Sequence, residues 1–72
     1  MTIGDIIKYK DYDYISYRLM LPDSLPGESI FAGCFKSEGG KIISLDGDSY
    51  SENEKVVSYS ETENGLEVVV RV

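Results

Sequence analysis

Three carboxylates near the middle of the chain are the first residues whose types and spacing could do chemistry. Asp46, Asp48 and Glu52 lie close together in the sequence, and clustered carboxylate oxygens are the ligands that Ca²⁺ and other hard cations take. The spacing departs from an EF-hand loop, because Gly47 separates the two aspartates and Tyr50 stands at the third ligand position. We therefore expect a solvated turn in which the aspartates accept local backbone N–H groups. A metal-dependent small enzyme built on the three carboxylates is the alternative.

Other catalytic residue types are scarce. The chain has no histidine and a single cysteine, Cys34, which excludes a histidine-based triad, a two-histidine zinc site, a CxxC pair and an internal disulfide. Cys34 lies in an apolar run and is expected to be a buried small hydrophobe. Gly39, Gly40 and Lys41 lack the spacing of a phosphate-binding P-loop. We predict a protein that is not an enzyme and that uses no cofactor.

Tyrosine is the second candidate source of function. Four of the six tyrosines lie between positions 9 and 17. Aromatic grooves bind proline-rich peptides in SH3 domains, and tyrosine is common at protein interfaces. Tyr12 and Tyr14 stand beside Asp11 and Asp13, so that an aromatic groove rimmed by acids would suit a basic or proline-rich peptide. Tyr50 is a further candidate, and packing in the core is the alternative for these rings.

The negative charge is concentrated in one part of the chain. The net charge is −6, and residues 45–67 carry seven carboxylates against Lys55. A negative face formed there would repel phosphate backbones and anionic lipid, which argues against direct nucleic-acid or membrane binding. We predict a protein or peptide partner that carries positive charge. The candidate contact residues in this stretch are Glu52, Glu54, Glu61 and Glu63.

Two other functions fit the same charge pattern. Residues 46–63 of the acidic stretch could mimic nucleic acid and so inhibit a DNA- or RNA-binding protein, or the acidic stretch could serve solubility alone. Seventy-two residues predict a single domain, 1–72, with a thin core.

The lone cysteine favours a reducing compartment, and the N-terminal residues lack the pattern of a signal peptide. No apolar run approaches the roughly 20 residues that span a bilayer. We expect a cytoplasmic location.

The dominant local pattern is that of short β-strands separated by turn residues. Turn signals are the proline-containing loop 22–27, the pair Gly39-Gly40, the stretch 46–49 and the pair Asn64-Gly65, which favours a type I′ hairpin. The predicted strands are residues 3–9, 14–21, 29–36, 41–45, 55–60 and 66–72.

The first of these segments has a competing interpretation. Thr2 and Asp5 have the spacing of a capping box, and Ile3, Ile6 and Ile7 would share one face of a helix. Gly4 and the tyrosine-rich continuation argue against the helix. We therefore predict a strand, with Ile3, Ile7 and Tyr9 on one side.

These elements predict an all-β protein. A small antiparallel barrel of five or six strands, SH3-like in architecture, fits the size best because closure removes unpaired edges. A small β-sandwich is the alternative. If the barrel is open at the last strand, Val69 and its neighbours could pair with a second copy. We therefore expect a monomer or a weak homodimer.

Two segments carry a resemblance. Ile3-Gly4-Asp5-Ile6-Ile7-Lys8-Tyr9 resembles the first strand of many SH3-like barrels. Residues 31–51, FAGCFKSEGGKIISLDGDSYS, are similar to small acidic proteins of Gram-positive anaerobes and their mobile elements. The second resemblance covers under a third of the chain. It implies a bacterial cytoplasmic protein and no particular activity.

Overall fold

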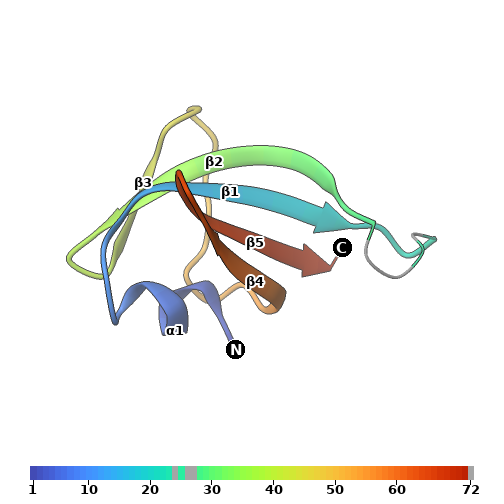
Figure 1. Cartoon of the computed structure of the whole chain (residues 1–72), viewed down its shortest axis with the longest axis horizontal. Helices are drawn as coiled ribbons and strands as arrows, with labels where there is room; N and C mark the ends of the chain where they lie inside the picture. Colours follow the sequence, from blue (N-terminus) through green and yellow to red (C-terminus); the bar gives the residue numbers. More distant parts are fainter. Residues whose placement is uncertain (24, 26–27, 72) are drawn as a thin grey trace.

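The structure, a computed structural model, describes residues 1–23, 25 and 28–71. One short helix and five strands form in the order α1 (Ile3–Ile7), β1 (Tyr12–Met20), β2 (Ile30–Glu38), β3 (Lys41–Ser44), β4 (Val56–Thr62) and β5 (Gly65–Arg71). The strands make one sheet in the order β3-β2-β1-β5-β4, and α1 lies under it (Figure 1). The predicted all-β class is confirmed.

The sheet differs from the predicted barrel in two ways. It is not closed, since β3 and β4 are its two edge strands. It is also mixed, because β1 pairs in parallel with β5 and antiparallel with β2. One face of the sheet is covered by α1 and by the segment 45–55. Among the described residues, no further strand joins β3 to β4 to close the sheet into a barrel. β5 lies between β1 and β4, so the idea that the last strand pairs with a second copy is wrong.

Residues 3–9 do not form the predicted strand. Residues 3–7 are helical, and the capping box is complete: the Asp5 N–H donates to Thr2 Oγ1 at 3.2 Å and the Thr2 N–H donates to Asp5 Oδ2 at 2.9 Å. This satisfies backbone donors that a helix start otherwise leaves unpaired. Tyr9 is 80% exposed rather than on the side of Ile3 and Ile7. The helical alternative holds because capping and burial of the isoleucines outweigh the low helix propensity of Gly4.

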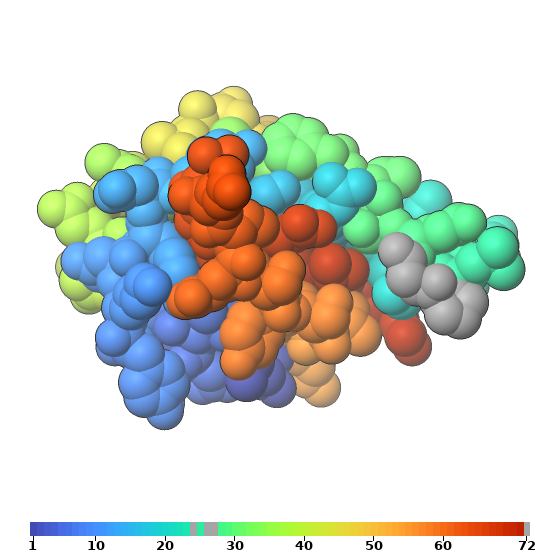
Figure 2. Space-filling view, viewed as in Figure 1, coloured from blue at the N-terminus to red at the C-terminus, as the bar shows by residue number. Residues whose placement is uncertain are grey.

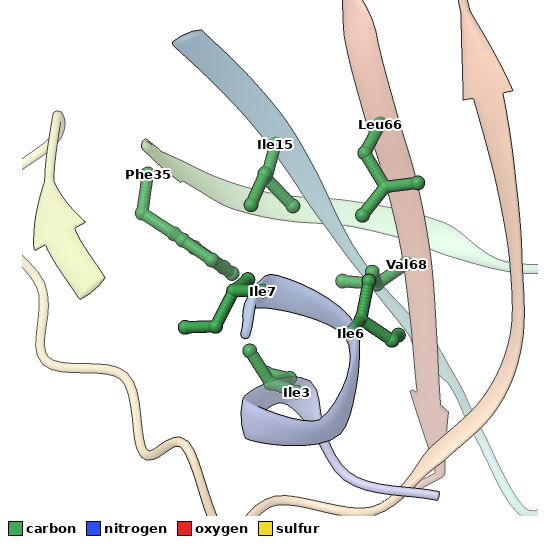
Figure 3. Packing of buried hydrophobic residues seen from close by; sticks show 7 residues of the cluster. All are labelled: Ile3, Ile6, Ile7, Ile15, Phe35, Leu66 and Val68. Carbon is green, nitrogen blue, oxygen red and sulfur yellow. The ribbon is translucent and has the colours of Figure 1, made fainter. Parts of the chain in front are cut away.

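The core lies between α1 and the sheet. The three isoleucines of the helix point at side chains of β1, β2 and β5 (Figure 3). Burial of such a side chain stabilises a fold by roughly 1.5–3 kcal/mol. A five-residue helix is too short to persist alone, so this packing is what holds it. The fully buried cluster is Ile3, Ile6, Ile7, Ile15, Phe35, Leu66 and Val68.

The connection between β3 and β4 joins the sheet to the N-terminal segment. The Ile3 N–H donates to the Glu54 carbonyl at 3.0 Å, and the Gly4 N–H donates to the Glu52 carbonyl at 2.8 Å. At the start of β4 the Val56 N–H donates to the Met1 carbonyl at 2.9 Å. These bonds satisfy N–H groups of the first helical turn and fix the long connection under the sheet.

Both predicted hairpins form, and one turn differs from the prediction. Gly39 and Gly40 have φ values of 60° and 78° and join β2 to β3 as a two-residue turn. At the second hairpin Thr62 pairs with Gly65, so Glu63 and Asn64 are the loop residues. Every positive-φ residue in the described part of the chain is a glycine, so Asn64 does not adopt the type I′ conformation predicted for it.

Some predicted features fall outside the described residues. Positions 24, 26 and 27 of the proline-containing loop and Val72 of the predicted last strand are among them. Within that loop Leu25 is 65% exposed. Cys34 is a free thiol on β2 and is half-buried rather than fully buried.

Candidate functional site

A groove lies where the start of β1 meets the β4–β5 hairpin. Parallel pairing of Ile15 with Leu66 brings the hairpin alongside the residues that precede and open β1. The hollow between the two segments measures about 290 Å³. In the space-filling view, the hairpin and β4, in orange, lie uncovered across the front of the molecule (Figure 2). The groove is lined by Lys10, Asp11, Tyr12, Asp13, Glu61, Thr62, Glu63, Asn64 and Gly65.

The groove contains four carboxylates and one amine. Glu61 is the centre of its hydrogen bonds: Lys10 Nζ and the Tyr12 hydroxyl each donate to Glu61 Oε1 at 3.1 Å. The hydrogen bonds from Lys10 and Tyr12 lower the pKa of Glu61, and the bond to Glu61 raises the pKa of Lys10. Both groups are therefore charged at neutral pH.

The other carboxylates of the groove, Asp11, Asp13 and Glu63, form no ion pair with a described residue. Asp11 Oδ1 accepts the Gly39 N–H at 2.9 Å, which ties it to the neighbouring hairpin. Asp11 and Asp13 also line a second hollow, of about 200 Å³, beside β2, which contains Lys36 and Glu38 as well. With four carboxylates and one lysine, the groove carries an excess of negative charge.

The structure brings together Tyr12, Glu61 and Glu63 among the candidate partner-binding residues and separates Tyr14 from them. Tyr12 and Tyr14 both lie in β1, and residues two apart on a regular strand share a face. A register shift between Tyr12 and Ile15 breaks that rule. Tyr12 packs against the core, whereas the side chain of Tyr14 neighbours that of Cys34, the residue opposite Ser16. Burial raises the pKa of Tyr14.

The remaining candidates, Tyr50, Glu52 and Glu54, lie elsewhere, on the connection from β3 to β4. The Tyr50 ring packs against those of Phe35 and Tyr17, with centroid distances of 4.8 and 5.0 Å. The Tyr17 hydroxyl donates to Glu54 Oε1 at 2.5 Å. Burial is the main cause that raises the pKa of both Tyr17 and Tyr50. Tyr50 and Glu54 thus hold the connection against the sheet, and the backbone carbonyl of Glu52, which accepts the Gly4 N–H, holds it against α1.

Asp46 forms the predicted turn. Its Oδ1 accepts the Asp48 N–H at 3.0 Å and the Ser44 hydroxyl at 3.1 Å, and its Oδ2 accepts the Cys34 N–H at 3.1 Å and the Tyr50 hydroxyl at 2.5 Å. These hydrogen bonds, led by that from Tyr50, lower the pKa of Asp46 to about 2. Within the described residues, no three acidic, cysteine or histidine side chains lie close enough to hold a metal ion.

The carboxylates of residues 45–67 contact four different parts of the molecule. Asp46 is bonded to β2, Glu54 to Tyr17 beneath the sheet, Glu61 to Lys10, and Glu67 to Arg18 with an N···O distance of 3.5 Å. The charge of the stretch is therefore divided. Two carboxylates of this stretch, Glu61 and Glu63, lie in the groove. They are joined there by Asp11 and Asp13, which belong to residues 1–20, a segment without net charge.

Comparison of the chain with models of protein families, with curated proteins and with solved structures finds no match. Among the residues that the structure describes, there is no helix with the length and apolar character needed to cross a membrane.

Proposed function

We propose that this protein is a non-enzymatic interaction module that binds a basic segment of another protein in the groove between the start of β1 and the β4–β5 hairpin. The observation that carries the proposal is the charge of the groove: four carboxylates face one lysine. Such a site attracts lysine and arginine side chains over a distance set by ionic strength. It repels nucleic acid and anionic lipid for the same reason.

The geometry favours a basic ligand over a proline-rich one. Proline-rich peptides pack on open aromatic faces, and Tyr12 is the one tyrosine among the groove residues. Lys10 Nζ lies 5.0 Å from the centroid of the Tyr12 ring, and the hydroxyl is bonded to Glu61. The ring therefore supports the carboxylates and offers little surface for proline to pack on.

The two alternative functions have less support. A nucleic-acid mimic needs its charges spread along one surface, and Asp46, Glu54 and Glu61 of the proposed mimic, residues 46–63, are bonded to separate partners. A metal-dependent enzyme needs Asp46 as a ligand, and both oxygens of Asp46 already accept two hydrogen bonds each. A cation there would have to displace these donors.

The proposal is tested by NMR titration of the ¹⁵N-labelled protein with three twelve-residue peptides, one lysine-rich, one proline-rich and one glutamate-rich. We expect the lysine-rich peptide alone to shift the amide signals of residues 10–13 and 61–65. Binding should weaken as salt rises from 20 to 300 mM, conditions chosen to shorten the Debye length. Absence of shifts with millimolar lysine-rich peptide would refute the proposal.

A matched pair of double variants separates local charge from net charge. D13N/E63Q removes two groove carboxylates that have no ion-pair partner among the described residues. D23N/E28Q removes two exposed carboxylates from the β1–β2 connection, at the other end of β1. Both variants have the same net charge. We expect about fivefold weaker binding for D13N/E63Q and unchanged binding for D23N/E28Q; equal weakening by both would mean that no specific groove exists.

A further inference from the structure

One edge of the sheet is open beside the groove. β4 pairs with β5 on one side. On its other side, the described residues make a single bridge, between Thr2 and Lys55 at the start of the strand. Residues 57–62 are all exposed, and Figure 2 shows this strand uncovered. No backbone hydrogen bond from another segment of the described chain reaches the outward N–H and C=O groups of residues 57–62, and such groups are the template for adding a strand.

The sequence of β4 does little to protect this edge. Natural edge strands are kept unpaired by short length, by lysine or proline, or by bulges. The opposite edge, β3, has four residues, whereas β4 has seven and contains neither lysine nor proline. Its irregularity lies between Val56 and Ser58, so the track from Ser58 to Thr62 is regular. The track contains serine, tyrosine and threonine with one charge, that of Glu61.

The N-terminal residues of the chain already pair with the start of the same edge. The bridge between Thr2 and Lys55 is antiparallel, and the Val56 N–H donates to the Met1 carbonyl at 2.9 Å. This edge therefore accepts a chain that runs antiparallel to β4. Beyond it, residues 57–62 offer a free length of about 20 Å at 3.3 Å per residue.

Charge differs between the two ends of the free edge formed by residues 57–62. The Thr62 end adjoins the groove, with Glu61, Glu63 and Asp13. The Val57 end adjoins Lys55 and Arg71, which line a hollow with Val56 and Val57. An antiparallel ligand begins beside Thr62 and ends beside Val57, so its N-terminal half meets the carboxylates. A second copy of this chain would bring six further negative charges to the same place, which disfavours it as the occupant.

We propose that the basic ligand binds as an extended strand that adds antiparallel to the free edge of β4 at residues 57–62, with its lysine or arginine residues in its N-terminal half. This inference rests on the proposed function, and it specifies the conformation, direction and charge order of the ligand. Main-chain hydrogen bonds to β4 supply affinity, and the carboxylates of the groove select the basic end.

Four capped peptides test the inference. The first is acetyl-Lys-Thr-Lys-Thr-Val-Thr-Val-amide, and the second has the same residues in reverse order, so that composition and charge are equal. The third and fourth are N-methylated forms of the first peptide, each methylated on one alternate set of amides. Only alternate N–H groups of an added strand face β4. One N-methylated peptide therefore loses the N–H groups that would donate to β4, and the other keeps them. Binding to the wild-type protein is measured by NMR titration, and protection by amide hydrogen exchange across β4.

We expect the first peptide to slow exchange of amides within residues 57–62 and the reversed peptide to bind about fivefold more weakly. One N-methylated form should lose about tenfold in affinity, while the other binds like its parent. Equal binding by all forms without slowed exchange would overturn strand addition and leave the proposed groove function intact. Failure of every lysine peptide to bind would overturn the proposed function itself. Slow β4 exchange without peptide, with doubled molecular mass, would identify a second copy as the occupant and overturn the inference.

Discussion

For Asp46 the sequence predicts the local turn but not the hydrogen bonds to residues of other segments. The sequence predicts its local turn, because Asp-Gly-Asp favours bonds between a carboxylate and a nearby N–H. Its bonds to Cys34 and Tyr50 depend on how β2 lies against the connection to β4. A Cβ atom at Gly33 would overlap both the Tyr50 hydroxyl and the Asp46 carboxylate. The sequence offers no local signal for such a close approach.

The low pKa of Asp46 makes its contribution to stability depend on pH. The folded protein holds this pKa at about 2, below the ordinary value of 3.8. A lowered folded-state pKa means that the stabilisation is complete above the ordinary pKa and is lost as pH falls through the folded value. We expect D46N to lower the melting temperature at pH 7 and the gap from wild type to close between about pH 4 and pH 2. Thermal melts followed by circular dichroism across this range measure it.

Asp48 supplies the control for this experiment. It lies two residues away on the same exposed turn, and the hydrogen bond it makes to Asp46 is donated by its backbone N–H. D48N therefore removes the same charge and keeps that bond. We expect its melting temperature to stay near that of the wild type at pH 7. A gap for D46N that persists unchanged at pH 2 would contradict the role given to the ionised carboxylate.

At the scale of elements, the hairpins were predictable and the first element was not. Turn residues act locally, so Gly39-Gly40 and Asn64-Gly65 marked both hairpins within a residue. Residues 3–7 fit either a strand or a helix, because a short isoleucine-rich run satisfies both periods. The capping box and the burial of the isoleucines against β1, β2 and β5 stabilise the helix over the strand. Parallel pairing of β1 with β5 joins distant segments and has no local signal.

The capping box predicts a measurable cost for losing the Thr2 side chain. Thr2 Oγ1 accepts the Asp5 N–H at the start of α1. Replacement of an N-cap threonine by alanine costs about 1 kcal/mol. We expect T2A to lower the free energy of unfolding by this amount in urea denaturation, whereas T2S, which keeps a hydroxyl acceptor, should lose less than half as much. Equal losses for both variants would show that the methyl group of Thr2, and not its hydroxyl, is what matters.

At the scale of the whole molecule, the net charge and the open sheet have opposite effects on association between copies. Two edge strands expose backbone groups that could pair with another copy. A net charge of −6 keeps copies apart at neutral pH. The sequence predicted the net charge and the five strands after the first segment, but a closed barrel was expected only because closure removes unpaired edges. α1 and the connection 45–55 cover the face of the sheet instead, and that arrangement leaves the β4 edge free.

This opposition predicts self-association where the net charge vanishes. The isoelectric point is near pH 4.4, and we expect light scattering to rise there as the repulsion is lost. Lysine on an edge strand hinders pairing with another chain, so S60K should suppress the scattering. S49K adds the same charge at an exposed position on the connection between β3 and β4, away from the edge, and should scatter like the wild type near its own isoelectric point. Because the two variants have equal charge, equal scattering would show that charge alone controls association, whereas suppression by S60K alone would identify the β4 edge as the surface through which copies meet.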